Sequence, residues 1–165
     1  MNRETLQLIN TFFNVGLMKP APGTWGSLAA LVIGWGIERY LGFWPLVVAT
    51  VIVTAVGFVT IKAELALRPG EEDPSEIVID EVAGMWLAML FPAAGFWMRD
   101  MSMVWPGPIA AFLLFRLFDI SKPWLVGRAD RRGDAAGVML DDLWAGLFAG
   151  LCTLVLAGLY HAVLM

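Results

Sequence analysis

Residues 43–61 read FWPLVVATVIVTAVGFVTI and contain no charged side chain. A predominantly apolar stretch of this length is close to the roughly 20 residues that an α-helix needs to cross the hydrocarbon core of a bilayer. Residues 143–164 form a second stretch of similar length and character. Together, the two segments predict a helical membrane protein rather than a water-soluble domain.

The composition of the whole chain supports this prediction. Of its 165 residues, 59% are hydrophobic and 16% are charged, compared with about 45–50% and about 25% in soluble domains. The length suits a single domain over residues 1–165. A net charge of −4 provides no basic field that would attract nucleic acid, so we expect no nucleic-acid partner. The single cysteine, Cys152, excludes an intrachain disulfide and lies in an apolar run, where we expect it to be a small buried hydrophobe.

Three shorter apolar stretches cover residues 25–37, 82–98 and 104–118. We therefore expect an all-α fold, a compact multi-pass helical membrane protein with about five apolar helices, some tilted or in a locally thinned bilayer. Residues 4–17 carry apolar side chains at helical spacing with polar interruptions, which predicts an additional N-terminal helix in the membrane interface. A loop over residues 19–27 is expected to follow it.

Charged residues are distributed unevenly over the predicted loops. With five crossings, nine of the eleven lysines and arginines fall on the side of the N-terminus and of loops 62–81 and 116–142, which leaves Arg39 and Arg99 for the other side. The positive-inside rule places the first group in the cytoplasm. Of the fifteen acidic residues, only Glu38 and Asp100 fall on the outer side. This asymmetry indicates a polar working face on the cytoplasmic side.

The first charged cluster precedes the third apolar stretch. Asp73, Pro74 and Glu76 have the spacing of a capping box, which predicts that a helix begins there. Asp80 and Glu81 follow an Ile-Val-Ile run, where that helix should already be entering the membrane. Burial of carboxylates there is costly unless they are paired or bind a cation, so a functional role is favoured.

The second cluster is Arg116, Asp119 and Lys122, which are spaced three apart and so share one helical face. Pro123 disfavours helix at Lys122 and marks the helix end. An interfacial salt-bridge ladder is the alternative interpretation. Exposed pairs of that kind contribute only about 0–1 kcal/mol, which does not by itself explain three charges on an apolar helix.

The third cluster contains Asp141 and Asp142 at the expected start of the last apolar helix. Acidic residues there also suit the helix dipole, which is the structural alternative. A small residue follows one turn later, as Gly84 follows Asp80 and Gly146 follows Asp142, and small residues allow a second helix to approach closely. The upstream arginines 128, 131 and 132 suit anionic phosphate, either of a substrate or of lipid headgroups.

Carboxylates at three helix entrances fit a site for a hard cation, and Mg²⁺ prefers carboxylate, water and phosphate oxygens. The candidate metal ligands are Asp80, Glu81, Asp119, Asp141 and Asp142. The candidate catalytic residues are Asp80, Glu81, Asp119, Lys122 and Asp142. Phosphate binding is expected from Thr24, Ser27, Arg116, Lys122, Arg128 and Arg131, although Thr24 and Ser27 also suit a plain helix start.

Two geometric expectations follow from a single site. The carboxylates of Asp80, Asp119 and Asp142 should approach to roughly 4–6 Å, given metal–oxygen bonds near 2.1 Å. The loop over residues 19–27 should fold over them, because its glycines permit close backbone approach.

Four motifs occur in order between about residues 14 and 150. They are APGTWGSL at 21–28, IVIDE at 77–81 with Gly84-Met85-Trp86, Phe115-Arg116 with Asp119 and Lys122-Pro123-Trp124, and Gly137-Val138-Met139 with Asp141-Asp142 and Ala145-Gly146. In these motifs the chain resembles the phosphatidylglycerophosphatase A family. It departs from the family pattern at Asp134-Ala135-Ala136, where the family usually has a Gly-Gly pair.

The resemblance implies a Mg²⁺-dependent phosphatase of the bacterial inner membrane, with its active site facing the cytoplasm. Its substrate would be the phospholipid phosphatidylglycerol phosphate, and its products phosphatidylglycerol and inorganic phosphate.

The chain lacks the residues that cysteine-based and histidine-based phosphatases need. Cys152 is not followed by the arginine of a Cys-x₅-Arg motif, and the only histidine, His161, stands at the far end of the last helix. Metal-activated water remains, with an aspartate nucleophile as a second interpretation. An ion-coupled small membrane transporter is the alternative function, but its carboxylates should lie near the bilayer midplane rather than at one interface. A purely structural membrane subunit would not need these acidic residues together.

Overall fold

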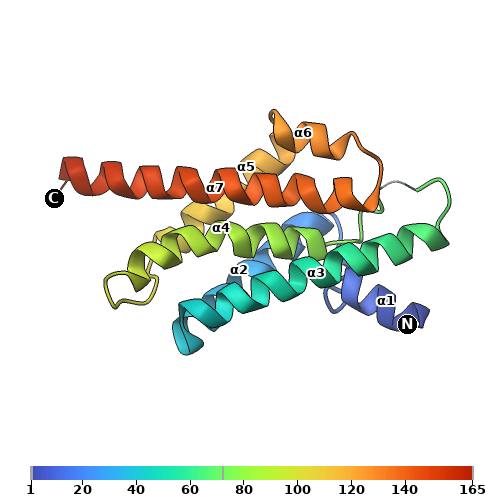
Figure 1. Cartoon of the computed structure of the whole chain (residues 1–165), viewed down its shortest axis with the longest axis horizontal. Helices are drawn as coiled ribbons and strands as arrows, with labels where there is room; N and C mark the ends of the chain where they lie inside the picture. The colour runs from blue at the N-terminus through green and yellow to red at the C-terminus, as the bar shows by residue number, and fades with distance from the viewer. Residues whose placement is uncertain (1, 72, 165) are drawn as a thin grey trace.

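Seven α-helices and one short 3-10 helix form the regular structure of residues 2–71 and 73–164, the part of the chain that this computed structural model describes. The side chains of residues 161–164, His161 among them, lie outside that description. Figure 1 shows an elongated helical bundle with the chain termini at opposite ends of its long axis. No strand occurs in the described ranges, so the predicted all-α class is confirmed.

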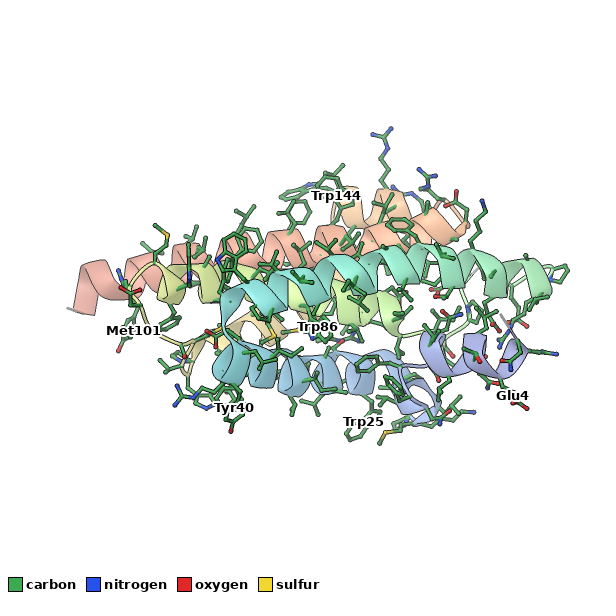
Figure 2. The ribbon with its side chains drawn as sticks, turned by 60° about the horizontal axis from the view of Figure 1, so that its bottom comes forward. Glu4, Trp25, Tyr40, Trp86, Met101 and Trp144 are labelled. Carbon is green, nitrogen blue, oxygen red and sulfur yellow. The ribbon has the colours of Figure 1, made fainter. Side chains whose placement is uncertain are left out.

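The five longest helices make up the bundle, and Figure 1 shows their arrangement. They are α2 (Pro22–Leu41), α3 (Phe43–Leu67), α4 (Ile79–Trp97), α5 (Gly107–Ser121) and α7 (Ala135–Leu164). Helix α4 is central, since it packs against each of the other four and buries most of its side chains. We call the end where α2 and α4 begin and α5 finishes the polar end. Tyr40 and Met101 mark the opposite end in Figure 2, and Glu4 lies beyond the polar end.

Three of these helices are long and apolar enough to cross a membrane, judged by length and composition: α3, α4 and residues 135–160 of α7. The predicted number of about five is too high by this measure. Helix α5 has 15 residues and so rises only about 22 Å, less than the roughly 30 Å of a hydrocarbon core. Helix α2 has 20 residues, but its four glycines and the pair Glu38-Arg39 lower its mean hydropathy.

The N-terminal helix is shorter than predicted. Helix α1 covers Arg3–Asn10, residues 12–14 adopt positive φ, and a 3-10 helix covers Val15–Leu17. Asn10 is buried, and its carbonyl oxygen accepts the backbone N–H of Val78 at 2.9 Å. The last carbonyl of α1 therefore bonds to a distant segment instead of continuing the helix, which a periodicity argument does not detect.

The predicted capping box at Asp73 and Glu76 is wrong, because α4 begins only at Ile79. The Glu76 carboxylate accepts a hydrogen bond from the Arg68 guanidinium at 2.5 Å, and this bond lowers the pKa of Glu76. Arg68 also pairs with Glu64 at 2.8 Å, so it ties α3 to residues 73–78. Tertiary ion pairing thus takes the side chain that the capping box required.

The start of α7 also differs from the prediction. The helix begins at Ala135, six residues before Asp141, and the Asp134 carboxylate accepts the backbone N–H of Gly137 at 2.7 Å. Asp134 therefore caps the helix from within the Asp134-Ala135-Ala136 stretch. Asp141 and Asp142 lie nearly two turns inside α7, so the helix-dipole interpretation does not account for them.

Helices α4 and α7 approach each other through glycines. A Cβ atom added at Gly146 would lie 2.2 Å from the carbonyl oxygen of Gly84, and one added at Gly84 would lie 2.5 Å from that of Asp142. Both distances are below any tolerable contact, so only glycine allows the two backbones to pack here. The close approach predicted from the Asp80–Gly84 spacing is confirmed.

We predict that Gly146→Ala destabilises the protein by about 1–3 kcal/mol, the usual cost of overpacking a close contact. Gly158→Ala is the matched control, because it lies on the same helix and its added Cβ meets nothing within 4 Å. Thermal unfolding of the two variants in the same detergent tests this. Equal melting temperatures would show that the glycine contact does not hold α4 against α7.

Candidate functional site

A cavity of about 250 Å³ opens at the polar end of the bundle. Five parts of the chain form its wall: the start of α2, residues 73–77, the start of α4, the end of α5 and the second turn of α7. Figure 1 shows the start of α4 beside α7. The polar side chains that line the cavity are Thr24, Asp73, Ser75, Asp80, Glu81, Arg116, Asp119, Lys122, Asp141 and Asp142.

Three carboxylates converge at the base of this cavity. Asp80, Glu81 and Asp142 each offer one oxygen, and these oxygens all lie within 4.8 Å of one another. Asp80 and Asp142 are only 5% and 3% exposed. Asp80 and Glu81 come from the first turn of α4, and the contact through Gly84 and Gly146 brings Asp142 beside them.

The donor set of this cluster fits a hard divalent cation. One oxygen of Glu81 and one of Asp142 are buried and have no hydrogen-bond partner among the described residues. Three like charges at this separation repel one another, and their burial is costly unless a cation offsets it. Carboxylate oxygens are the ligands that Mg²⁺ and similar ions prefer, so these residues could hold such an ion.

The start of α2 packs directly against the cluster. A Cβ atom added at Gly23 would lie 2.3 Å from a carboxylate oxygen of Glu81. Ala21, the N-cap residue, provides no capping side chain, so the first backbone N–H groups of α2 remain available at the cavity wall. The positive end of the helix dipole at this point favours anions.

Arg116 connects α5 to α2 across the cavity. Its guanidinium contacts the Asp119 carboxylate at 2.5 Å, the Thr24 hydroxyl at 3.3 Å and the Ser27 hydroxyl at 3.4 Å. Its Nε is buried without a partner among the described residues. Asp119 thus lines the cavity as the partner of an arginine and does not belong to the group of three carboxylates.

Lys122 ends α5 in a left-handed backbone conformation, with φ of 45° and ψ of 53°. Its ammonium group donates to the Asp130 carboxylate and, at 3.0 Å, to that of Asp141. Partial burial on its own would lower the pKa of Lys122, but the two carboxylates outweigh burial and raise this pKa above its ordinary value. The cavity therefore contains a fixed positive charge.

The sequence model of the family described as phosphatidylglycerophosphatase A matches residues 8–157. The chain belongs to the phosphatidylglycerophosphatase A family.

Individual relatives agree with this family. Proteins named phosphatidylglycerophosphatase A from Haemophilus influenzae and Escherichia coli are each 32% identical to the chain, over 145 and 143 residues. These alignments cover 87% and 86% of the chain and 83% and 77% of the two relatives. A Bacteroides thetaiotaomicron protein, provisionally named a phosphatidylinositol-3-phosphatase, is 37% identical over 145 residues, 86% of the chain and 87% of its own length. No solved structure matched the chain.

The family motifs meet at the cavity, though not every candidate residue does. Of the five candidate metal ligands, three form the cluster, while Asp119 and Asp141 line the same cavity in ion pairs. Thr24 lines the cavity, but the predicted loop over residues 19–27 is wrong in its bounds, because α2 begins at Pro22 and Thr24 belongs to its first turn. Ser27 is buried outside it and donates to the carbonyl oxygen of Gly23 at 2.7 Å.

The predicted phosphate ligands Arg128 and Arg131 do not line the cavity. Sequence reasoning placed them there because they are basic and close in sequence to Asp141, but α6 (Leu125–Asp130) directs Arg128 into a separate groove. Conversely, Asp73 and Ser75 line the cavity and were not proposed. Asp73 was interpreted as part of a capping box and Ser75 carried no signal of its own, and only the turn over residues 73–78 brings both to the wall.

We predict that Gly23→Ala displaces the Glu81 carboxylate and weakens divalent-cation binding about tenfold, because a displaced ligand loses its coordination geometry. The fold should survive, since the group that must move is the end of a flexible side chain. Gly36→Ala on the same helix is the control, because its added Cβ meets nothing within 4 Å. Mn²⁺ titration followed by electron paramagnetic resonance measures the effect. Unchanged affinity would remove Glu81 from the cation site.

Proposed function

We propose that this chain is a Mg²⁺-dependent phosphatase that hydrolyses phosphatidylglycerol phosphate to phosphatidylglycerol and inorganic phosphate. The observation that carries the proposal is one cavity, at the end of an apolar helical bundle, that is lined by two buried carboxylates, one partly buried carboxylate, an arginine and a lysine. The family match and the names of the relatives from Haemophilus influenzae and Escherichia coli support the substrate.

In this proposal the two kinds of charge have separate tasks. Asp80, Glu81 and Asp142 would hold the ion, which would polarise the phosphoryl group and activate water. Arg116 and Lys122 would bind phosphoryl oxygens and stabilise the negative charge that develops as the bond from phosphorus to the glycerol oxygen breaks. Asp119 and Asp141 would hold the guanidinium of Arg116 and the ammonium of Lys122 in place through their ion pairs.

The proposed location is the bacterial inner membrane, with several crossings and the cavity facing the cytoplasm. The three apolar helices support membrane insertion. Nine of the eleven lysines and arginines belong to segments at the polar end, and the positive-inside rule assigns such an end to the cytoplasm. In this orientation the acyl chains of the substrate stay in the bilayer while its headgroup reaches the cavity.

The transporter alternative is not favoured, because the carboxylates lie at one end of the bundle and not midway along it. A second lipid substrate has more support, since the relative from Bacteroides thetaiotaomicron carries the name of a phosphatidylinositol-3-phosphatase. Measurement of kcat/KM for phosphatidylglycerol phosphate and for phosphatidylinositol 3-phosphate in the same mixed micelles decides between the two. We expect the first value to be larger.

We predict that Asp80→Asn and Asp142→Asn each reduce phosphate release about 10²-fold or more, because loss of a metal ligand removes several kcal/mol of transition-state stabilisation. Asn keeps the shape of the side chain and makes helix insertion less costly, so both proteins should still fold. Phosphate release across a Mg²⁺ titration is the measurement.

The control for these variants is Asp100→Asn, an exposed carboxylate beyond the opposite end of α4, which should leave the rate unchanged. Wild-type rates in both cluster variants would contradict the metal-phosphatase proposal. Partial rescue of Asp80→Asn by high Mg²⁺ would support a ligand role for this residue.

Lys122→Gln should have a different effect from the cluster variants. We expect Mn²⁺ affinity to remain within about twofold, while kcat/KM for the lipid substrate falls about 10²-fold through the loss of a charged phosphate contact. Parallel cation titration and steady-state kinetics separate the two effects. Loss of cation affinity with unchanged substrate saturation would instead show that Lys122 organises the carboxylates.

A further inference from the structure

A second hollow lies outside the proposed catalytic cavity, between α6 and α7. Its volume is about 270 Å³, and its walls are Leu125, Arg128, Ala129, Arg132, Leu140 and Trp144. It shares no lining residue with the catalytic cavity. Leu140 and Asp141 are neighbours in α7, so the same turn of this helix presents a carboxylate to the cavity and apolar side chains to the groove.

The arginines of this groove are available for an anion. Arg128 is exposed, and its side chain has no hydrogen bond or ion pair within the described part of the chain. Arg132 contacts Asp134 through Nε at 3.1 Å and Nη2 at 3.0 Å. That pair is half exposed and so contributes little, and a guanidinium has five N–H donors, which leaves several of them free.

The backbone holds the two arginines in a fixed position relative to α7. A Cβ atom added at Gly137 would lie 2.8 Å from the carbonyl oxygen of Ala129 and 2.9 Å from Cβ of Arg132. Helix α6 and the residues after it are therefore in direct contact with α7. A groove built on such a contact is preformed and does not need to be ordered by its ligand.

An aromatic and apolar track leads away from the arginines along α7. Trp144 stacks on Phe148 with ring centroids 6.1 Å apart, and Trp124 meets Phe148 edge-on at 6.4 Å. Leu151 and Val155 continue the same helical spacing and are 46% and 62% exposed. Figure 2 places Trp144 at the outer edge of the molecule. In membrane proteins, basic side chains at the headgroup region with aromatic side chains next to them on the hydrocarbon side are typical of the membrane–water interface.

We propose that this groove binds an anionic membrane phospholipid, with Arg128 and Arg132 on its phosphate and with its acyl chains along Trp144 and Phe148. Two guanidinium groups in one groove supply positive charge and planar N–H donors, which phosphate oxygens accept. The apolar track matches the chains, which free phosphate or a phosphopeptide would not use. The site is separate from the proposed catalytic cavity, and the inference does not depend on the chain being a phosphatase.

The test uses the full chain, purified and delipidated in a non-ionic detergent. Phosphatidylglycerol with brominated acyl chains is titrated in, and quenching of tryptophan fluorescence reports contact between the chains and the protein. Brominated phosphatidylcholine serves as the lipid without net charge. No turnover is involved, so the result is independent of the catalytic proposal.

We expect Arg128→Gln/Arg132→Gln to bind phosphatidylglycerol at least tenfold more weakly than wild type, approaching the affinity for phosphatidylcholine. Both arginines are exposed, so the variant should fold. The matched control is Arg39→Gln/Arg99→Gln, which removes the same charge at the opposite end of the bundle and should bind as wild type does. A second variant, Trp144→Phe, keeps a ring in the groove and should lose a large share of the charge-dependent quenching.

Three results would overturn the proposal. Equal loss in the Arg39/Arg99 control would show a general charge effect. Weakened binding in Lys122→Gln, with none in the Arg128/Arg132 variant, would place the lipid in the catalytic cavity. Displacement of the lipid by millimolar inorganic phosphate would show that the groove binds any anion and does not contact the acyl chains.

Discussion

The close contact of α4 and α7 at Gly84 and Gly146 determines where the charges of this protein lie. Any side chain at either glycine would separate the two backbones. Because the backbones touch, Asp142 of α7 comes beside Asp80 and Glu81 of α4 in an interior with little water. Such a concentration of like charge is unfavourable by itself, and it persists because the surrounding helices hold it in place.

The rest of the polar end supplies opposite charge in paired form. Arg116 is anchored by Asp119, and Lys122 is anchored by Asp130 and Asp141. Each cation keeps its charge and part of its surface toward the cavity. An anion that enters therefore meets preorganised donors, which lowers the reorganisation needed at the moment of reaction.

The segment between α3 and α4 shows how a site can depend on residues that never touch a ligand. Arg68 bonds to Glu64, Glu71 and Glu76, and Val78 donates to the carbonyl of Asn10. These contacts turn residues 73–78 into a cavity wall instead of a first helical turn. They also explain why α1 is short and why α4 begins later than its sequence suggests.

The sequence by itself determined the helical class, the asymmetry of charge and the identity of most of the charged residues at the site. These follow from composition, from apolar stretches such as residues 43–61, and from carboxylates at Asp80 and Asp142 whose burial needs a reason. They are local properties, and a period or a spacing is enough to detect them.

Only the tertiary structure decided which of those residues form the carboxylate cluster and which form ion pairs. It grouped Glu81 with Asp80 and Asp142, while Asp119 is paired with Arg116. It also places Arg128 outside the cavity, in a separate groove between α6 and α7. These outcomes depend on which helix faces pack together and on ion pairs between segments far apart in the chain, and neither is encoded in local spacing.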